Sequence, residues 1–579
     1  MIDSVLLSPL PTPAEMNAWD KAASDMGLST ELLMENASRE ALHTLEDTLG
    51  DLRGQTVLCL AGPGNNGGDA IALARHLHDA RAEVTLLLVR PAWAYTGAPG
   101  FHLRLARRTG VNIRQLGVRK PALVFEPNED SGGEPGESSG PACIPLEVFL
   151  ADLESAPSPD IVVDGLLGTG LKGDPSSEYA ALIEAVNRLG ESSFVLALDI
   201  PSGLSGLTGR PSSHTIRADL TVTFEAAKLG LRLPAALPHV GELEVRAIGI
   251  PRTVQEELPP THRLLAPGLS LLLPEMDPAM HKGVAGRLLV IGGSPGLTGA
   301  PLLAAMGALR AGVGLVTVAC PGGLEPTLKA GYPDVMTMPL GDGREWTAAM
   351  AREIVLRLLQ FDALVIGPGI GRGADTAEFL SELANALQAG RPAEEVADGQ
   401  LAPGLVADSP EGDPLPCVWD ADALFWLASN PGRLASTSRS IITPHSGEAA
   451  RLLGRSVDEI EADRPGAARK LADSLGVTAI LKGPASLVCA GKDASKTLFV
   501  SPFITPNLAV GGSGDVLAGV LGSLLVRDLS PLLAACLGVY WHGLAGRLVS
   551  GDFPYRGNLA SDIAQTLPRA LTEWLDAKS

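Results

Sequence analysis

The chain of 579 residues has only six cysteines, and no two of them form a Cys-x-x-Cys pair or a cluster with histidine. This scarcity excludes the usual zinc spacings and suits a reducing compartment. Basic residues are outnumbered, 45 against 66 acidic ones, and the net charge of -21 argues against nonspecific binding to nucleic acid or anionic membranes. No basic and apolar leader opens the chain, and no uninterrupted apolar run reaches about 18 residues. We therefore expect a cytoplasmic protein that binds neither membrane nor nucleic acid.

Glycine (66 residues) and proline (45 residues) are abundant, and 45% of the chain is hydrophobic. This composition suits α/β domains with many functional turns rather than a disordered chain. The length favours two large domains. Short Val, Ile and Leu runs alternate with helical stretches rich in Ala and Leu, which predicts parallel sheets covered by helices.

Most of the predicted strands run into Gly, Pro, Asp or Lys at their carboxyl ends, where open α/β sheets bind ligands. They are expected near Thr56–Ala61, Val84–Val89, Asp160–Asp164, Phe194–Asp199, Leu220–Phe224, Arg287–Ile291, Gly314–Ala319, Ala363–Ile366, Cys417–Asp420, Ser440–Thr443 and Thr478–Lys482. The composition changes within 251–267, which predicts domains at 1–255 and 268–579 joined by a linker at 256–267. Stretches rich in Gly, Ser, Pro and acidic residues at 126–145 and 389–416 are expected to be surface insertions.

A glycine-rich segment, Gly62-Pro-Gly-Asn-Asn-Gly-Gly-Asp69, lies between the first strand and an expected helix at 70–80. It has the Gly-x-Gly-x-x-Gly spacing of phosphate-binding loops, which alone is a weak signal. A dinucleotide-dependent redox enzyme also needs an acidic residue at the end of the next strand to hold a ribose. That strand ends in Arg90, so the sequence disfavours hydride transfer.

Two further strands of the first half end in an acidic residue. Asp164 opens the segment Asp-Gly-Leu-Leu-Gly-Thr-Gly-Leu-Lys-Gly-Asp174, and Asp199 opens Asp-Ile-Pro-Ser-Gly203. Either acid alone could be an ordinary turn residue. Together, Asn66, Asp164 and Ser202 make an all-oxygen set suited to a hard cation, which leaves Asp199 as the acid/base.

The second half has its richest signal near the C-terminus, in Gly511-Gly-Ser-Gly-Asp515. The glycines let backbone N–H groups approach a phosphate closely. The start of the following helix favours the ionised form of Asp515, which could then act as a base. The bare string could also be a glycine-rich turn with an Asp cap.

Other polar motifs follow strands of the second half, and no Gly-x-x-x-x-Gly-Lys-Ser/Thr string of a P-loop is present. The motifs are His281–Gly286, Gly292–Ala300, Gly367–Gly371, Asp420–Asp422, Thr443–Glu448 and Lys482–Ser486. Taken singly, the acids could be turn residues, His445 a helix cap and Lys482 a solvated lysine. Their shared place at strand ends favours one site.

Residues 10–255 resemble the NAD(P)HX epimerase domain, on the first-half motifs together with Ala218–Lys228 and the ending Gly249-Ile-Pro251. The resemblance implies a Rossmann-like three-layer α/β/α fold, a potassium ion at Asn66, Asp164 and Ser202, and Asp199 as acid/base near Lys228. It also implies substrate contacts at Asn65, Asn66, Gly67, Gly68, Asp69, Gly168, Thr169, Gly170, Leu171, Lys172, Gly173, Asp174 and Asp199. Three departures are visible: Ser38 and Ala70 where the family usually has Gly, and the acidic insertion at 126–145.

Residues 265–575 resemble the ADP-dependent NAD(P)H-hydrate dehydratase family, a branch of the ribokinase-like α/β superfamily, in the order of their motifs. The resemblance implies substrate contacts at Ala300, Gly371, His445 and Asp515, with Asp515 as the base. It implies nucleotide contacts at Lys482, Gly483, Pro484, Ala485, Ser486 and Gly514. Two motifs have Ser where Thr is common, at Ser486 and Ser513, and either residue keeps a hydroxyl.

The two resemblances together predict a bifunctional enzyme that repairs hydrated NADH and NADPH. One domain would interconvert the R and S forms of NAD(P)HX, and the other would dehydrate the S form with ADP and Mg²⁺, giving AMP and phosphate. Two alternatives stay open: a ribokinase-like kinase of a small alcohol, and a first half that is a non-catalytic binding or dimerisation module. We further expect a homo-oligomer.

Overall fold

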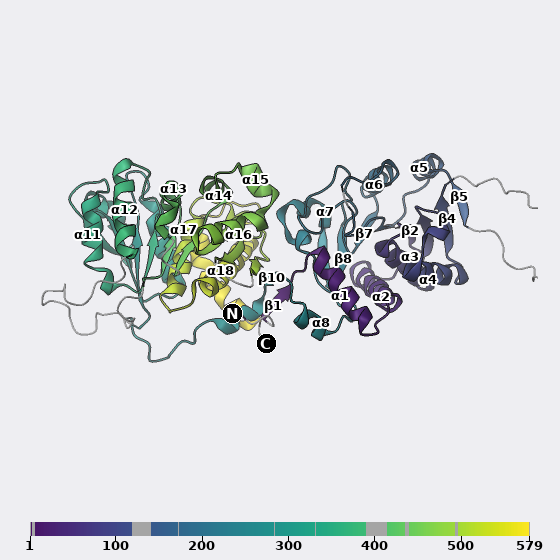
Figure 1. Cartoon of the computed structure of the whole chain (residues 1–579), viewed down its shortest axis with the longest axis horizontal. Coiled ribbons are helices and arrows are strands. Elements are labelled where there is room, and N and C mark those ends of the chain that lie inside the picture. The colour runs from purple at the N-terminus through teal and green to yellow at the C-terminus, as the bar shows by residue number, and fades with distance from the viewer. Residues whose placement is uncertain are drawn as a thin grey trace, which may run out of the picture. The chain divides into compact units, whose positions relative to one another are not determined.

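The computed structural model describes residues 2, 6–117, 141–171, 173–282, 284–330, 332–388, 414–434, 439–491 and 496–577. It divides the chain into two compact units, Pro9–Pro260 and Thr261–Ser579, and the second unit also includes the chain up to Ser8 (Figure 1). Most of both predicted insertions, and Lys172, lie outside the described residues.

The first unit contains an eight-stranded sheet in the order β5-β4-β3-β2-β6-β7-β8-β9, and every pair of neighbours is parallel. Its strands are β2 (Thr56–Ala61), β3 (Glu83–Leu88), β4 (Asn112–Leu116), β5 (Ala142–Ile144), β6 (Ile161–Gly165), β7 (Phe194–Leu198), β8 (Leu220–Phe224) and β9 (Glu242–Arg246). The strand order reverses between β2 and β6, and a ligand crevice is expected at such a switch point.

Helices cover both faces of this sheet, as parallel strands buried on two sides require (Figure 1). One face packs against α1 (Pro13–Asp25), α2 (Thr30–Leu49), α3 (Asn65–Asp79) and α4 (Gly97–Arg108). The other packs against α5 (Leu146–Ser155) and α6 (Ser177–Leu189). The short helices α7 (Leu237–Val240) and α8 (Arg252–Glu257) complete the unit. The result is the predicted three-layer α/β/α arrangement.

The second unit contains an eleven-stranded sheet in the order β1-β10-β19-β18-β17-β16-β15-β14-β11-β12-β13. Its strands are β1 (Leu7–Pro9), β10 (His262–Leu265), β11 (Arg287–Ile291), β12 (Leu315–Pro321), β13 (Met336–Leu340), β14 (Ala363–Ile366), β15 (Cys417–Trp419), β16 (Ser440–Ile442), β17 (Thr478–Leu481), β18 (Leu487–Ala490) and β19 (Leu498–Val500). The order reverses between β11 and β14, and β18 runs antiparallel to both of its neighbours.

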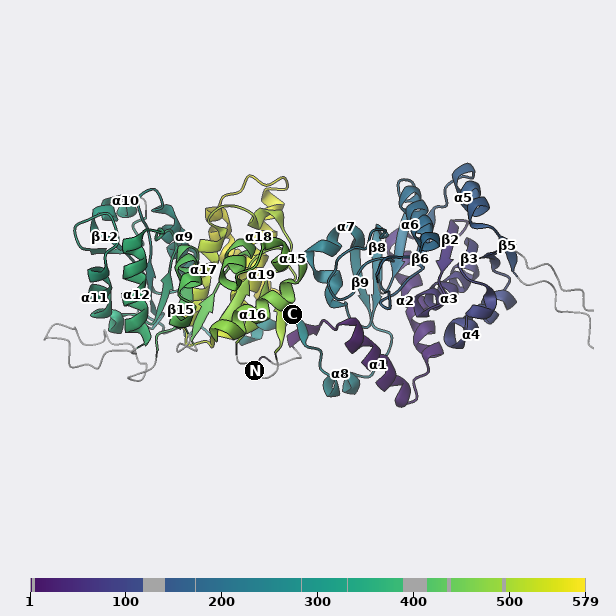
Figure 2. The same ribbon diagram turned by 45° about the horizontal axis from the view of Figure 1, so that its top comes forward.

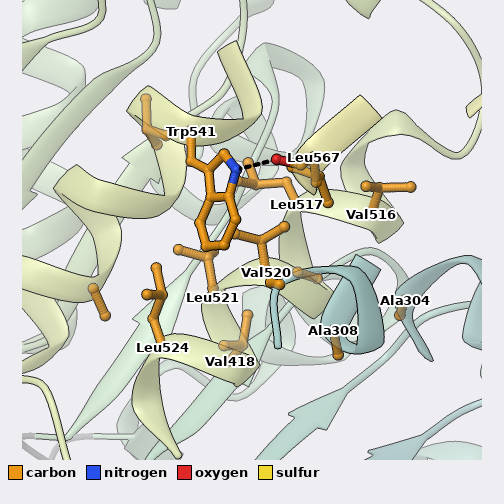
Figure 3. Packing of buried hydrophobic residues seen from close by; sticks show 14 of the residues in the cluster. Ala304, Ala308, Val418, Val516, Leu517, Val520, Leu521, Leu524, Trp541 and Leu567 are labelled. Carbon is orange, nitrogen blue, oxygen red and sulfur yellow. Dashed lines mark hydrogen bonds between the residues drawn. The ribbon is translucent and has the colours of Figure 1, made fainter. Parts of the chain in front are cut away.

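One face of the second sheet shares a hydrophobic core with four helices, α9 (Gly299–Arg310), α17 (Ser513–Leu525), α18 (Pro531–Asp552) and α19 (Ala560–Asp576). Figure 3 shows part of this core, where Trp541 donates a hydrogen bond of 2.8 Å to the Leu567 carbonyl. Helix α18 is long and apolar enough to cross a membrane, but 78% of its most apolar window is buried inside the unit, so it is a core helix.

The second unit has further helices, of which Figure 2 labels α10, α11, α12, α15 and α16. They belong to the series α10 (Glu325–Lys329), α11 (Ala348–Val355), α12 (Ala374–Gln388), α13 (Asp422–Ser429), α14 (Ser446–Leu453), α15 (Val457–Ala462) and α16 (Arg464–Leu475). Successive side chains along β11 point to opposite faces of the sheet. Leu288 and Val290 belong to the hydrophobic core that includes α17. Leu289 and Ile291 are equally buried outside that cluster, so this sheet is also covered on both faces.

Every predicted strand is present, with ends within two residues of those expected. Eight strands were not predicted, most of them at or near the edges of the sheets: β1, β4, β5, β9, β10, β13, β18 and β19. The division of the chain also differs from the expectation, because the stretch 256–267 contains β10 instead of forming only a linker. Strand β1 joins the second unit although the first unit follows it in sequence. Sheet pairing between distant segments leaves no local pattern in the sequence.

Candidate active sites

The first candidate site is a cavity of about 790 Å³ at the switch point of the first sheet. It is lined by the segments that follow β2 and β6, by Asp199 after β7, and by α1 and α2. The segments after β2 and β6 approach so closely that a Cβ on Gly62 would lie 2.0 Å from the Leu166 carbonyl oxygen. Glycine is therefore required at this position.

Residues Asn65–Asp69 form the first turn of α3, so the expected helix start at residue 70 is wrong. Gly64 is the N-cap, and no side chain caps the helix, which leaves the first N–H groups free of a side-chain partner. Gly67 makes this start possible, since a Cβ there would lie 1.8 Å from the Gly62 carbonyl oxygen. A helix N-terminus at the cavity is suited to an anionic ligand.

Asp199 and Lys228 form the charged centre of the cavity. Asp199 has a left-handed backbone, with φ of 59°, which an L residue adopts only where the surroundings enforce it. The Lys228 ammonium donates hydrogen bonds to Asp199 Oδ1, to Thr223 Oγ1 at 3.0 Å and to the Phe224 carbonyl at 3.1 Å. Lys228 is 1% exposed, whereas the Asp199 side chain is 20% exposed and lines the cavity. The carboxylate is therefore the member of the pair that a ligand can reach.

The three predicted cation ligands are connected by hydrogen bonds with one another and with Leu167. The Ser202 hydroxyl donates to Asp164 Oδ1 at 2.6 Å and accepts from the Leu167 N–H at 2.8 Å. Asn66 Nδ2 donates to the Leu167 carbonyl at 2.9 Å, while the buried Asn66 Oδ1 has no hydrogen-bond partner. Burial raises the pKa of Asp164 to about 6, although hydrogen bonds from Ser202 and Leu166 oppose the rise.

The other predicted substrate contacts of the first unit divide into two groups. Asn65, Asn66, Gly67, Asp69 and 168–171 line the cavity. Gly68, Gly173 and Asp174 do not: Gly68 packs under Met34, and the Asp174 carboxylate accepts a hydrogen bond from Ser213 N. Lys172 lies outside the described residues.

Helix α1 is a wall of the cavity that the sequence analysis did not identify. The helix turns one face to the cavity and buries Trp19 and Ala23 on another. The lining residues of α1 are Met16, Asn17, Asp20, Lys21, Ser24 and Asp25. Their spacing of three or four residues was visible in the sequence, but nothing in it indicated which element the polar face would meet.

The second candidate site lies at the carboxyl ends of β11 and β14–β17 in the second unit. The loops after β11 and β14 join where Ser294 donates a hydrogen bond of 2.9 Å to the Gly369 carbonyl. Asp422, in the first turn of α13, accepts from Gly371 N at 3.1 Å and from Arg372 Nε at 2.6 Å. Ala300, the other predicted contact here, lies in the first turn of α9, and its methyl group faces Gly369.

Lys482 contacts both the residues at the strand ends and the glycine-rich turn. Its ammonium donates a hydrogen bond of 2.7 Å to Asp420 Oδ1, which also accepts from the Thr443 hydroxyl at 2.6 Å. A Cβ on Gly514 would lie 3.0 Å from Lys482 Nζ, so the backbone of the turn packs directly on this ammonium. Burial alone would lower the pKa of Lys482, but Asp420 and Glu448 raise it overall, and the ammonium stays charged.

Asp515 differs from the expectation that it would be readily ionised. It lies in the first turn of α17, as predicted, but burial raises its pKa to about 7. The carboxylates of Asp420, Asp422 and Glu448 add to the rise, and only Lys482 opposes it. Burial, together with the neighbouring acids, therefore keeps the pKa of Asp515 high although the residue lies at a helix N-terminus.

His445 and the loop 482–486 border the same place. The His445 ring accepts a hydrogen bond from Gly447 N at 3.0 Å and caps α14, while its side chain stays 61% exposed. In the loop, Gly483 and Ala485 have positive φ angles of 144° and 50°. The Ser486 hydroxyl, which was expected to face a ligand, donates to the Gly483 carbonyl at 3.0 Å. Pro484 lies between these two turning residues.

The arrangement of both units defines a class of protein. Each is a doubly wound α/β unit in which carboxylates and one lysine gather at the carboxyl ends of the strands. An acid with a raised pKa that is held beside a glycine-rich turn can take part in proton and phosphoryl transfer. The fold and the two sites thus define a two-domain α/β enzyme.

Comparison with known proteins identifies the family. Residues 288–569 match the model of the NAD(P)H-hydrate dehydratase family, and residues 30–230 match that of the YjeF-related protein N-terminus. A bifunctional NAD(P)H-hydrate repair enzyme of Moorella thermoacetica is 35% identical over 571 residues, 97% of this chain and 96% of the relative. The enzyme of that name from Escherichia coli is 34% identical over 554 residues, 95% of this chain and 91% of the relative. The chain belongs to the family of bifunctional NAD(P)H-hydrate repair enzymes.

A solved structure is similar to the second unit. It is an ADP/ATP-dependent NAD(P)H-hydrate dehydratase from Bacillus subtilis, co-crystallised with ATP and Mg²⁺. It is 25% identical, with a TM-score of 0.41, and covers 53% of this chain and 96% of its own.

Proposed function

We propose that this chain repairs hydrated NADH and NADPH with two active sites. The first unit interconverts the R and S forms of NAD(P)HX, and the second dehydrates the S form with ADP, giving AMP and phosphate. The observation that carries the proposal is the family relationship along 97% of the chain, with a charged pair at the carboxyl ends of the strands in each unit.

The second site fits a phosphoryl-transfer dehydration. Hydroxide is a poor leaving group at neutral pH, so the C6 hydroxyl of the hydrate must first be activated. We assign Asp515 as the base that removes the hydroxyl proton while the oxygen attacks the terminal phosphorus of ADP and AMP leaves. The ring nitrogen then expels phosphate, and loss of a C5 proton restores the double bond.

The backbone around Asp515 supports the same assignment. The turn 511–514 presents N–H groups at the start of α17, and Lys482 lies against Gly514. Dipoles and a fixed ammonium at this place would stabilise charge on the transferring phosphoryl group. The predicted contacts of Ala300, Gly371 and His445 with substrate, and of 482–486 with nucleotide, are part of this proposal.

Magnesium is expected with the nucleotide, as in the crystals of the Bacillus relative. Among the described residues, no group of three or more His, Cys, Asp or Glu side chains is arranged to hold a metal. Asp420 and Asp422 already accept hydrogen bonds from protein groups. The described side chains thus form no ready magnesium site, and we assign no step to the ion.

The first unit offers a more suitable set of ligands for a potassium ion than the second unit offers for magnesium. Asn66, Asp164 and Ser202 supply only oxygen atoms, which suits a hard cation. Asn66 Oδ1 is buried without a partner, and the buried Asp164 carboxyl lacks a counter-charge among its hydrogen-bond partners. We propose that these residues hold K⁺, whose charge would keep Asp164 ionised and the adjoining loop 166–171 in place.

The fixed pair of Asp199 and Lys228 supports an epimerase rather than a binding module in the first unit. A module that only binds or dimerises needs neither a buried lysine nor a strained acid at a cavity. We propose that Asp199 is the acid/base of the epimerisation, and that Asn65, Asn66, Gly67, Asp69 and 168–171 contact substrate. Gly68, Lys172, Gly173 and Asp174 remain predicted contacts.

We further propose that the protein works in the cytoplasm, which fits the free thiols of all six cysteines. That the protein forms a homo-oligomer remains a prediction. The same holds for the absence of membrane and nucleic-acid partners, which the acidic charge favours.

The test is to incubate the purified protein with an R and S mixture of NADHX, with and without ADP and Mg²⁺, and to follow NADH absorbance. Complete recovery that requires ADP is expected. Asp515→Asn should abolish it, and Asp199→Asn should limit it to the S form plus slow spontaneous interconversion. The expected loss in each catalytic step is at least about 100-fold, the usual contribution of a general base. No recovery with any nucleotide would refute the proposal and favour a small-alcohol kinase.

A further inference from the structure

Helix α1 holds a third acidic side chain in the epimerase cavity. Thr12 and Glu15 form a capping box at the start of the helix. Trp19, fully buried, donates a hydrogen bond of 2.8 Å to the Leu258 carbonyl. Asp20 follows Trp19 directly, so the anchored indole fixes the position from which the Asp20 carboxyl reaches the cavity lining.

Asp20 shares the cavity with Asp199, Lys228 and Asp69. The carboxyl groups of Asp20, Asp69 and Asp199 interact with one another and with the Lys228 ammonium, and they cannot all be ionised at low cost. Among the described residues, no group donates a hydrogen bond to the Asp20 carboxyl, which leaves it available to a ligand. Burial raises the pKa of Asp20 to about 6, with Asp199 and Glu225 adding to the rise and Lys228 opposing it.

Epimerisation at C6 of the hydrate requires an acid as well as a base. C6 carries a hydroxyl group and is bonded to the ring nitrogen N1. Removing the hydroxyl proton forms a C6=O bond and breaks the C6–N1 bond, whose electron pair takes a proton at N1. Rotation about C5–C6 and the reverse reaction on the other face of the carbonyl give the opposite epimer. No oxidant or second substrate is consumed.

Lys228 cannot supply that proton, because its ammonium is engaged with Asp199, Thr223 and Phe224 and is 1% exposed. Asp69 is less suited, since burial raises its pKa well above the usual value and it is only 8% exposed. Asp20 is half-buried, and it comes from a different element than Asp199. An acid and a base on separate walls can serve two atoms of one ring.

We propose that Asp20 is the second catalytic residue of the epimerase site and donates the proton to N1 while Asp199 accepts the hydroxyl proton. This inference rests on the proposed epimerase function. On ring closure Asp20 takes the N1 proton back, and Asp199 returns its own to the oxygen. Each turnover thus leaves both groups as they began.

The test uses the full chain with Asp515→Asn, so that dehydration does not consume either epimer. Purified R-NADHX is added, and the appearance of the S form is followed by chiral chromatography. Asp20→Asn should lower kcat by about 100-fold or more with little change in KM, since general acids contribute about 10²–10⁴. Asp20→Glu should recover part of the rate. Asp79→Asn, an exposed carboxyl at the far end of α3, is the matched control.

The pH profile separates a proton donor from a structural residue. The parent's epimerisation rate should fall as pH rises through about 6, because the acid form of Asp20 is lost. Asp20→Asn should lack that fall. The charged groups that face Asp20 are Lys228, Asp199, Asp69 and Glu225, together with Lys21 and Asp25 of its own helix, and all remain in the variant.

An Asp20→Asn rate within about threefold of the parent, or an unchanged pH profile, would overturn the inference. An unchanged melting transition of the first unit in calorimetry of Asp20→Asn verifies that the unit that carries the substitution is folded. If the parent itself interconverts no epimers, the proposed epimerase function fails instead. The two failures are therefore distinguishable.

Discussion

At the scale of single residues, burial decides which carboxyl groups can exchange protons. Asp515 and Asp20 have pKa values raised to about 7 and about 6 because they are desolvated beside other acids. Asp160, fully exposed, has a lowered pKa because Thr56 donates hydrogen bonds to it. The same side chain thus becomes a proton-transfer group or a fixed acceptor according to its surroundings.

The pH dependence of dehydration should report on Asp515. A base works only when ionised, so kcat/KM for S-NADHX should rise with pH and reach half of its plateau near 7. The measurement is a set of initial rates between pH 5 and about 9 at saturating ADP. A rate that does not change over this range would contradict Asp515 as the base.

Asp420→Asn provides the control for this assignment. The variant removes the neighbour that, after burial, most raises the pKa of Asp515, and it frees Lys482 to stabilise the ionised form. The midpoint of the profile should therefore move to lower pH, whatever the change in maximal rate. A midpoint that moves upward would show that another group titrates.

At the scale of elements, the second site depends on how closely α17 packs on α9. A Cβ on Gly519 would lie 1.9 Å from the Ala304 carbonyl oxygen, and one on Gly307 would lie 2.4 Å from that of Val516. The two helices therefore meet through their backbones. This contact fixes the start of α17, which carries Asp515.

Gly519→Ala should destabilise the second unit by about 1–3 kcal/mol, because overpacking outweighs the gain of up to about 1 kcal/mol in helix propensity. Dehydratase activity should fall as well, since α17 must shift. Urea unfolding and kcat measure the two effects. Gly551→Ala is the matched control: it lies near the end of α18 with open space around it and should be neutral or slightly stabilising. Equal effects of the two changes would contradict close packing.

At the scale of the whole molecule, the chain leaves its second unit and later returns to it. Strand β1 pairs beside β10 in the second sheet, and Leu7 is buried in the core with Leu265 and Leu269. The first unit, Pro9–Pro260, is inserted between these strands. The N-terminal residues therefore stabilise the dehydratase unit.

Leu7→Ala should lower the stability of the second unit by about 2–4 kcal/mol, the usual cost of removing a buried leucine side chain. The melting transition of the second unit should move down in calorimetry, while the transition and the epimerase activity of the first unit stay unchanged. Leu271→Ala, at a position 60% exposed in the second unit, should shift neither transition. A lower transition in the first unit would contradict the assignment of β1.

The sequence by itself determined the parts whose signals are local. Apolar runs that end in Gly, Asp or Lys fixed the central strands and placed Asp164, Asp199, Asp420 and Lys482 at their carboxyl ends. Parallel strands bring such ends to one edge, so the sequence predicts that these strand-end side chains gather in each unit. The glycine turns were equally readable, and Gly512 has a φ of 90°, a local conformation that favours glycine.

Only the tertiary structure decided the features that depend on distant partners. It placed β1 in the second sheet and turned β18 antiparallel, because strand pairing is chosen by long-range packing. It brought the polar face of α1, with Asp20, to the epimerase cavity. It also reversed the expectation for Asp515, since a pKa depends on every charge and every layer of protein that surrounds the group, and these come from all parts of the fold.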